Sequence, residues 1–281
     1  MKISGFTFIK NAIKYDYPVV ESIKSIIPIC DEMIVAVGNG DDNTRQLIEN
    51  IGDRKIRIID TIWDESLKKD GAVLADETNK AFAEVSADSD WAFYIQADEV
   101  VHENDLQIIY SAAQEFQKSK EVEGLLFKYR HFYGSYDFIA DSYHWYRREI
   151  RMIRNDKSIF SYRDAQGFRK KPNEKLKVKL IDAYINHYGW VRPPGKMQQK
   201  IVKMHSFYHD QEWIKKNVAE EQDFDYSKID SLKFFDGKHP SVIQDRIAAK
   251  NWSFDRDISY KNMSLKNRFK FFVEKLTGYR I

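Results

Sequence analysis

Residues 90–105 read DWAFYIQADEVVHEND, and this is the most informative segment of the chain. Trp91 to Gln96 is an apolar run of strand length, and Asp98 and Glu99 follow it directly. Carboxylate oxygens are the ligands that Mg²⁺ and Mn²⁺ prefer, so this pair is a candidate metal or ligand site. Acidic residues also follow many strands simply because turns are polar. Residues elsewhere in the chain are needed to distinguish a ligand site from an ordinary polar turn.

The first hundred residues alternate short apolar runs with helical patterns. This alternation predicts an α/β fold with a mostly parallel sheet flanked by helices. Ligands of such sheets bind beyond the carboxyl ends of the strands, which is where Asp98 lies. The predicted strands are Lys2 to Ile9, Glu32 to Val37, Lys55 to Ile62 and Trp91 to Gln96, and the predicted helices are Tyr17 to Ile27, Asn43 to Ile51 and Ala72 to Ser86.

The composition of the 281 residues excludes several classes of protein. The 45 basic and 43 acidic residues nearly cancel, so total charge gives no reason to expect nucleic acid as a partner. A single cysteine, Cys30, excludes an intramolecular disulfide framework. No apolar run reaches the length of about 18 to 20 residues that spans a bilayer, and the N-terminus does not read as a signal peptide. We therefore expect a cytoplasmic protein.

Several motifs occur in an order that resembles the family 2 glycosyltransferases, which have the GT-A (Rossmann-like) fold. The resemblance covers roughly residues 3 to 105 and continues more weakly to about 190. It implies an enzyme that moves a sugar from a nucleotide-sugar donor to a glycan or lipid-linked acceptor, with inversion, in surface polysaccharide biosynthesis. The motifs are the turn Gly38-Asn39-Gly40-Asp41-Asp42, the helical Thr78-Asn79-Lys80, Asp90-Trp91, Gln96-Ala97-Asp98-Glu99 and Ile150 to Asn155.

The resemblance also implies which residues form the donor site. Asp98 matches the last Asp of the family's DxD motif and, together with His187, would hold Mn²⁺ or Mg²⁺. Two departures are present, because Gln96 stands where the first Asp of DxD is expected and Val37 stands where a carboxylate usually ends the second strand. The predicted nucleotide-sugar-binding residues are Lys10, Asn11, Asn39, Asp41, Asp42, Asn79, Gln96 and Asp98. Basic residues after His187 that could offset diphosphate charge are Arg192, Lys196, Lys200 and Lys203.

Sugar transfer also requires a base that takes the proton of the acceptor hydroxyl. Asp164 is our candidate, because it follows a predicted strand in the segment Ser161 to Gly167. Glu149 is the alternative, with Asp141 as a further rival. For each of them, a solvated surface carboxylate is the competing interpretation. His205 and His209 have the spacing of a zinc pair, but Ser206 stands where a zinc-protease motif would need Glu.

The domain prediction divides the chain near residue 195. Residues 1–194 would form the GT-A-like domain, which holds the donor and acceptor sites, and residues 195–281 a mainly helical extension packed on it. Residues 246–281 contain nine basic and three acidic residues. Within them, an apolar face lies beside a basic one, a pattern that suits a helix on an anionic membrane surface. The alternative is a helix packed on the domain with a solvated basic face. The apolar residues are Leu265, Phe269, Phe272, Val273 and Leu276, and the basic ones are Lys266, Arg268, Lys270 and Lys275.

Two other functions remain open at this stage. A nucleotidyltransferase would share the sheet and the carboxylates, but it would normally carry a glycine-rich phosphate loop after the first strand. The segment Phe6 to Asn11 contains no glycine. A catalytically degenerate domain that binds glycan or a partner protein is the second alternative, because of Gln96 and Val37.

Overall fold

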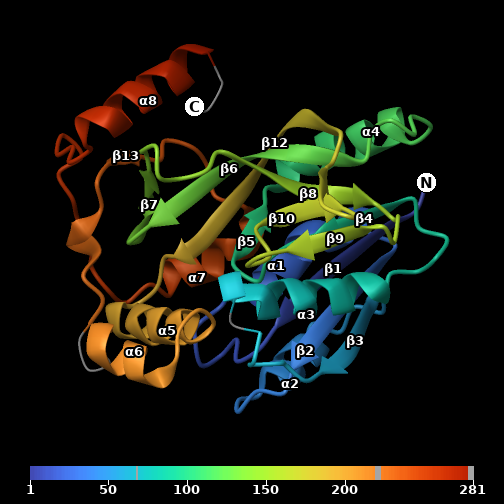
Figure 1. Ribbon diagram of the computed structural model, residues 1–281, viewed down its shortest axis with the longest axis horizontal. Helices are drawn as coiled ribbons and strands as arrows, with labels where there is room; N and C mark the ends of the chain where they lie inside the picture. Colours follow the sequence, from blue (N-terminus) through green and yellow to red (C-terminus); the bar gives the residue numbers. More distant parts are fainter. Residues whose placement is uncertain (68, 219–222, 278–281) are drawn as a thin grey trace.

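The computed structural model describes residues 1–67, 69–218 and 223–277. The first half of its central sheet is parallel, with strand order β3–β2–β1–β4 (Figure 1). Helical segments between these strands return the chain to the same edge each time, as parallel pairing requires. The predicted parallel sheet is confirmed. Its strands are β1 (Ile3–Ile9), β2 (Glu32–Gly38), β3 (Ile56–Thr61) and β4 (Trp91–Tyr94).

Beyond β4 the same sheet continues with mostly antiparallel neighbours. β8 pairs with β4 and β6, and a tight turn at Gly134, with φ of +71°, joins β6 to β7. The long strand β12 lies parallel to β6 and antiparallel to the short β5. The α/β fold therefore has a parallel core and a mixed second half. The added strands are β5 (Glu99–Val101), β6 (Gly124–Tyr133), β7 (Ser135–Ala140), β8 (Arg148–Arg154), β12 (Val178–Trp190) and β13 (Leu232–Phe234).

Helices cover both faces of the sheet. On one face pack α1 (Val19–Ile26), α2 (Thr44–Glu49) and α4 (Leu106–Phe116). The other face carries α3 (Ala72–Ala83), which lies in front of the strands in Figure 1. A small antiparallel sheet packs beside α3 and continues this second layer. Its strands are β9 (Ile159–Tyr162), β10 (Gly167–Lys170) and β11 (Glu174–Lys175).

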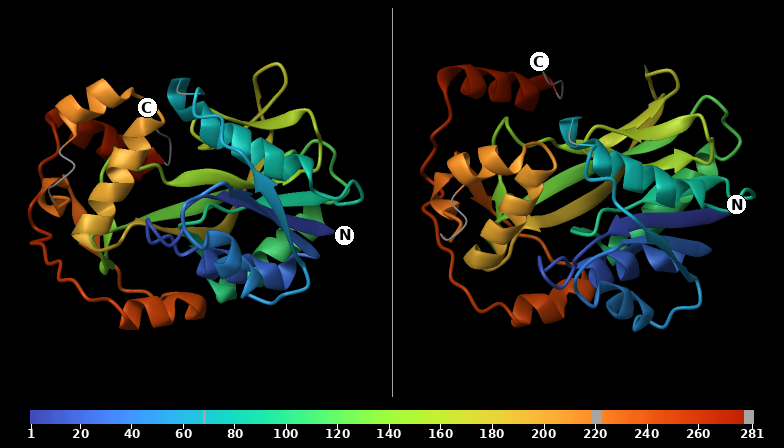
Figure 2. Two further views of the ribbon diagram at one scale, coloured as in Figure 1. Left: turned by 90° about the horizontal axis from the view of Figure 1, so that it is seen from below. Right: turned by 60° about the horizontal axis from the view of Figure 1, so that its bottom comes forward.

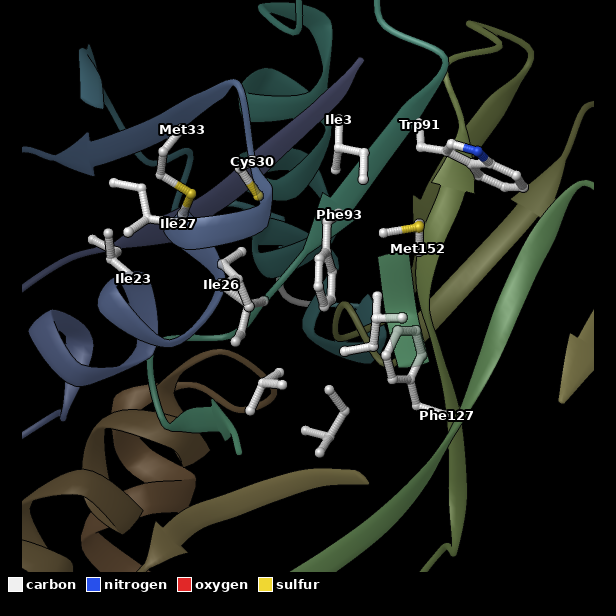
Figure 3. Packing of buried hydrophobic residues seen from close by; sticks show 14 of the residues in the cluster. Ile3, Ile23, Ile26, Ile27, Cys30, Met33, Trp91, Phe93, Phe127 and Met152 are labelled. Atoms are coloured by element: carbon white, nitrogen blue, oxygen red, sulfur yellow. The ribbon is translucent and has the colours of Figure 1, made fainter. Parts of the chain in front are cut away.

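Alternate residues of each strand point to opposite faces of the sheet, so the strands contribute side chains to two separate hydrophobic cores. Met33 and Val35 of β2 point to the face of α1, whereas Ile34 and Ala36 point to the face of α3. Figure 3 shows the first core, where Phe93 packs near Phe127 and Cys30 lies among aliphatic side chains. Burial raises the pKa of the Cys30 thiol to about 12, so this cysteine is an inert core residue.

After residue 193 most of the regular structure of the described residues is helical, with long irregular connections. This region contains α5 (Pro194–Ser206), α6 (Gln211–Asn217), α7 (Gln244–Ala248) and α8 (Leu265–Thr277), and β13 adds one strand to the edge of the main sheet at β7. In Figure 2 the segment between α7 and α8 runs along the outer edge of the molecule, past α5 and α6. In the described part of the chain, every helix is too short or too polar to cross a membrane.

Candidate functional site

A cavity of about 770 Å³ lies at the carboxyl ends of β1 and β4, where α5 forms its opposite wall. The edge of the sheet and the position of Asp98 are therefore as the sequence predicts. Six of the predicted site residues line this cavity: Lys10, Asn11, Gln96, Asp98, Asp164 and His187. Five others do not line it: Asn39, Asp41, Asp42, Asn79 and Glu149.

Asp98 is the buried anion of the cavity. It lies between β4 and β5, and its Oδ2 accepts a hydrogen bond of 2.9 Å from Lys200 Nζ of α5. The same ammonium donates to the carbonyl of Gly189 at 2.8 Å, so two acceptors fix its position. Burial alone would raise the pKa of Asp98, but Lys200 and His187 hold it well below its ordinary value. Asp98 is therefore a carboxylate at neutral pH.

Positive charge exceeds negative charge around this carboxylate. Burial, followed by the neighbouring Arg192, lowers the pKa of Lys200 to about 8. The Arg192 guanidinium is itself buried and donates to the carbonyl of Tyr15 at 2.8 Å. Both cations lie near the face of Tyr17, at 5.1 Å for Lys200 and 4.9 Å for Arg192. Two cations beside one anion favour a ligand that brings negative charge.

Two histidines, His187 and His131, lie next to Asp98. They face each other because β12 pairs with β6 in a register that sets His187 opposite His131. His131 Nε2 lies 3.1 Å from the carbonyl of Tyr146, which only accepts, so this nitrogen carries the proton. Burial lowers the pKa of His131 well below its ordinary value, so the ring is neutral and its Nδ1 accepts from His187 Nδ1 at 3.2 Å. This chain directs His187 Nε2 toward Asp98 Oδ2, 3.7 Å away.

The predicted metal pair is therefore brought together. A carboxylate oxygen and an imidazole nitrogen face one another beside Gly189, where an added Cβ would lie 2.3 Å from His187 Nε2 and 2.7 Å from Asp98 Oδ2. These donor types fit Mn²⁺ or Mg²⁺ only if a ligand such as a diphosphate supplies further oxygens. The described residues include no cluster of three or more His, Cys, Asp or Glu side chains placed to hold an ion. Lys200 already provides one positive charge to the same oxygen.

Gln96 contacts the backbone of the loop that carries Asp164. Its Nε2 donates to the carbonyl of Ala165 at 3.2 Å, which holds the loop that carries Asp164. Arg163 and Ala165, on either side of Asp164, have φ values of +54° and +61°. Such values strain residues other than glycine, and strain of this kind concentrates at functional sites. Gln96 thus connects the end of β4 to the Asp164 loop.

Asp164 also lines the cavity. Its Oδ2 accepts a hydrogen bond of 3.0 Å from the hydroxyl of Tyr208, just after α5. Gly71, with φ of +67°, begins α3 directly against this pair, and an added Cβ there would lie 3.0 Å from Asp164 Cβ. The loop, α3 and α5 therefore fix this carboxylate from three sides.

The turn after β2 is held by its own hydrogen bonds. Asn11, with φ of +58°, accepts from the backbone N–H of Asp41 at 2.8 Å. Asp41 pairs with Lys14 at 2.6 Å, and Asp42 accepts from the backbone N–H of Thr44 at the start of α2 at 3.0 Å. Asn39 accepts from the backbone N–H of Trp63 at 3.5 Å. Of these turn residues, only Asn11 reaches the cavity.

Asn79 and Glu149 also make local contacts. Asn79 forms a pair of hydrogen bonds with the backbone of Ser161 in β9, at 3.1 and 2.7 Å, and so ties α3 to the small sheet. Glu149 lies in β8 with its Oε2 3.8 Å from Arg151. Burial raises the pKa of Glu149 to about 7. Neither side chain borders the cavity, so Asp164 is the better placed of the two predicted bases.

Aromatic side chains form the other end of the cavity, and sequence reasoning missed them. Trp63 packs on Phe8 and Phe207, with ring centroids 5.7 and 5.6 Å apart. Lys10 lies over the Trp63 ring at 5.6 Å. Tyr17 was missed as well. Strand ends can be read from a sequence, but the aromatic residues that meet across a fold carry no local signal.

The two histidines with zinc-like spacing belong to the rim of this cavity. The ring of His209 stacks on Trp213 with centroids 3.6 Å apart, and the rings of His205 and His209 lie 5.8 Å apart. They are part of an aromatic stack between α5 and α6.

Comparison with known proteins gives matches to solved structures alone, since no family model and no curated protein matches the chain. The Staphylococcus aureus TarS 1–349 structure shares 14% identity at a TM-score of 0.42, and the match covers 78% of this chain and 70% of that one. This chain spans 39% of the longer S. aureus TarS structure, at a TM-score of 0.43.

Two further matches concern other enzymes. Glucosyl-3-phosphoglycerate synthase from Mycobacterium tuberculosis, in complex with Mn²⁺, UDP and phosphoglyceric acid, shares 17% identity at a TM-score of 0.31, over 46% of this chain and 43% of that one. A 4-diphosphocytidyl-2C-methyl-D-erythritol synthase from Anaerococcus prevotii shares 12% identity at a TM-score of 0.41, over 73% of this chain and 95% of that one. All of these matches have TM-scores below 0.5 and identities below 25%, so they carry no argument about the activity of this chain. The function has to be argued from the cavity itself.

Proposed function

We propose that this protein is a glycosyltransferase that binds a nucleotide sugar in the cavity at the ends of β1 and β4. The observation that carries the proposal is the buried Asp98–Lys200 contact, with Arg192 adding a second cation beside it. Such a surplus of positive charge stabilises the diphosphate that departs when the bond to the sugar breaks. The aromatic end around Trp63 offers flat faces for a base or a sugar ring.

In this proposal, separate residues of the cavity bind the diphosphate and take up the proton of the acceptor. Lys200 donates its protons toward the diphosphate, while Asp98 and the carbonyl of Gly189 keep its ammonium in place. When bound, Mn²⁺ or Mg²⁺ at Asp98 and His187 would neutralise further phosphate charge. Asp164 takes the proton from the acceptor hydroxyl as it attacks, and the hydroxyl of Tyr208 orients this carboxylate. A single base of this kind suits inversion at the sugar carbon.

The acceptor on this proposal is a glycan or a lipid-linked saccharide of surface polysaccharide biosynthesis. This part rests on the family resemblance of the sequence, and the cavity geometry supports the donor side more directly.

The test is an assay of nucleoside diphosphate release from UDP-, GDP- and dTDP-sugars, with Mn²⁺, with Mg²⁺ and with a chelator. We expect slow hydrolysis of at least one donor, and we expect Asp164→Asn to lower the rate while nucleotide binding is retained. Release of pyrophosphate from a nucleoside triphosphate, with no hydrolysis of any donor, would assign the site to a nucleotidyltransferase. No turnover and no nucleotide binding under any condition would leave a domain that only binds other partners.

A further inference from the structure

The outer face of α8 is an uncovered apolar stripe. Leu265, Phe269, Phe272 and Leu276 are 83, 63, 59 and 70% exposed. With about 100° of rotation per residue, these four positions fall within an arc of about 60° on the helix. Single exposed apolar residues are normal on a protein surface, but four in one row are not.

The opposite face of α8 attaches the helix to the protein. Phe271 is buried, and the Arg147 guanidinium lies 5.0 Å from its ring. Glu274 lies 3.6 Å from Arg147 Nε, and Asn267 hydrogen-bonds to His144 at 2.9 Å. These contacts hold the helix by its inner face, so the apolar stripe faces away from the domain. In Figure 1 and in the right view of Figure 2 the helix lies at the margin of the molecule, clear of the parallel sheet.

Positive charge borders the stripe. Lys266 lies on one side of it and Arg268 on the other, and both are exposed. Glu274 is the single acidic residue in the sequence of α8, and it is turned inward to Arg147, so it offsets nothing on the outer face. Lys275 is also exposed, with its ammonium 4.0 Å from Asp141.

We propose that α8 docks this protein on an anionic lipid surface. An apolar row flanked by cations matches the boundary between acyl chains and acidic headgroups, where a helix lies in the plane of the membrane. A second copy of the chain would cover the row equally well, but it would set the flanking cations of two identical helices against each other. The charge pattern therefore favours lipid. This inference does not depend on the chemistry of the cavity.

The experiment is co-sedimentation of the full chain with vesicles of neutral phosphatidylcholine, and with vesicles that also contain about 30% phosphatidylglycerol. We expect binding to the anionic vesicles that weakens when salt rises from about 0.1 M to about 0.5 M. The variant F269S/F272S should bind at least about 10-fold more weakly, because it removes two rings from the row.

A matched control is I62S/F234S, which removes apolar side chains that are 76 and 55% exposed elsewhere on the surface. It should bind as the wild type does, and F269S/F272S should keep the wild-type melting temperature because both of its positions are exposed. Absence of binding to anionic vesicles, or equal binding by F269S/F272S, would overturn the proposal. A dimer that F269S/F272S dissociates, without vesicle binding, would assign the stripe to a second copy of the chain.

Discussion

Asp98 and Glu99 are neighbours in sequence, and both are buried, yet the fold gives them opposite roles. Asp98 faces a cavity and contacts Lys200 at 2.9 Å. Glu99 faces the interior of the sheet, where Arg151 donates to it at 2.6 and 2.8 Å and the hydroxyl of Tyr129 donates as well. Neither Glu99 nor Arg151 borders the cavity. A closed pair stabilises structure, whereas a pair that opens onto a cavity can exchange its partner for a ligand.

The largest effect is expected from breaking the closed pair. Glu99→Ala removes the carboxylate to which the fully buried Arg151 donates its hydrogen bonds and leaves only Glu149, 3.8 Å away, as a counter-charge, which should cost about 3–5 kcal/mol of unfolding free energy. Urea denaturation measures this loss, and Glu115→Ala, an exposed carboxylate on α4, is the control. A loss below about 1 kcal/mol would show that the pair is not the fully desolvated contact seen here.

Breaking the open pair should affect activity more than stability. Asp98→Asn keeps the shape of the side chain but removes its charge, so Lys200 loses the anion that positions it. We expect donor turnover to fall about 100-fold, as for the loss of one preorganised electrostatic group. The unfolding free energy should fall by less than in Glu99→Ala. A full loss of folding with Asp98→Asn would make the two carboxylates equivalent and contradict the distinction.

The contribution of Glu149 to the free energy of unfolding should depend on pH. Its folded pKa is raised from 4.5 to about 7, so between these values the unfolded chain releases a proton that the folded protein keeps. Stability therefore falls as pH rises through this window, and Glu149→Gln should remove that fall. The variant should gain about 3 kcal/mol over the wild type above pH 7 and nothing near pH 4. Melting curves across pH measure this difference, and an equal effect at both ends would contradict it.

The smallest effect is expected at the turn after β2. Asp42→Ala removes an acceptor for the backbone N–H of Thr44 at the start of α2, which should cost about 1 kcal/mol. Because Asp42 does not line the cavity, nucleotide affinity should stay within about two-fold of the wild-type value. Thermal denaturation and calorimetry measure the two quantities. A ten-fold loss of affinity would return Asp42 to the donor site, as the sequence resemblance predicts.

The site residues that can be predicted from the sequence are those that directly follow a strand. Lys10, Gln96 and Asp98 follow strands, and parallel pairing brings them to one edge whatever the side-chain details are. His187 was found by its place in a later strand. Lys200 stood among several basic residues of α5, and only the packing of that helix shows which one reaches Asp98.

The remaining residues could not be ranked from the sequence because their role depends on distant contacts. The sequence motif predicts that Asn79 binds the nucleotide sugar. In the structure its side chain instead forms hydrogen bonds with the backbone of Ser161, 82 positions away. Gln96 reads as a lost metal ligand, but it holds the Asp164 loop. Such contacts join segments that no local pattern relates to each other.

The most direct test of the account is calorimetric titration of UDP, GDP and dTDP into the wild type, Lys200→Gln and Lys196→Gln, with and without Mn²⁺. Lys196 is the matched control, since its ammonium contacts the carbonyl of Lys14 and does not line the cavity. We predict that the wild type binds at least one of these nucleotides, that Lys200→Gln weakens this binding at least about 10-fold, and that Lys196→Gln leaves it unchanged. Binding that is equal in all three proteins, or absent from all of them, would contradict the claim that the cavity at Asp98 and Lys200 holds a nucleotide diphosphate.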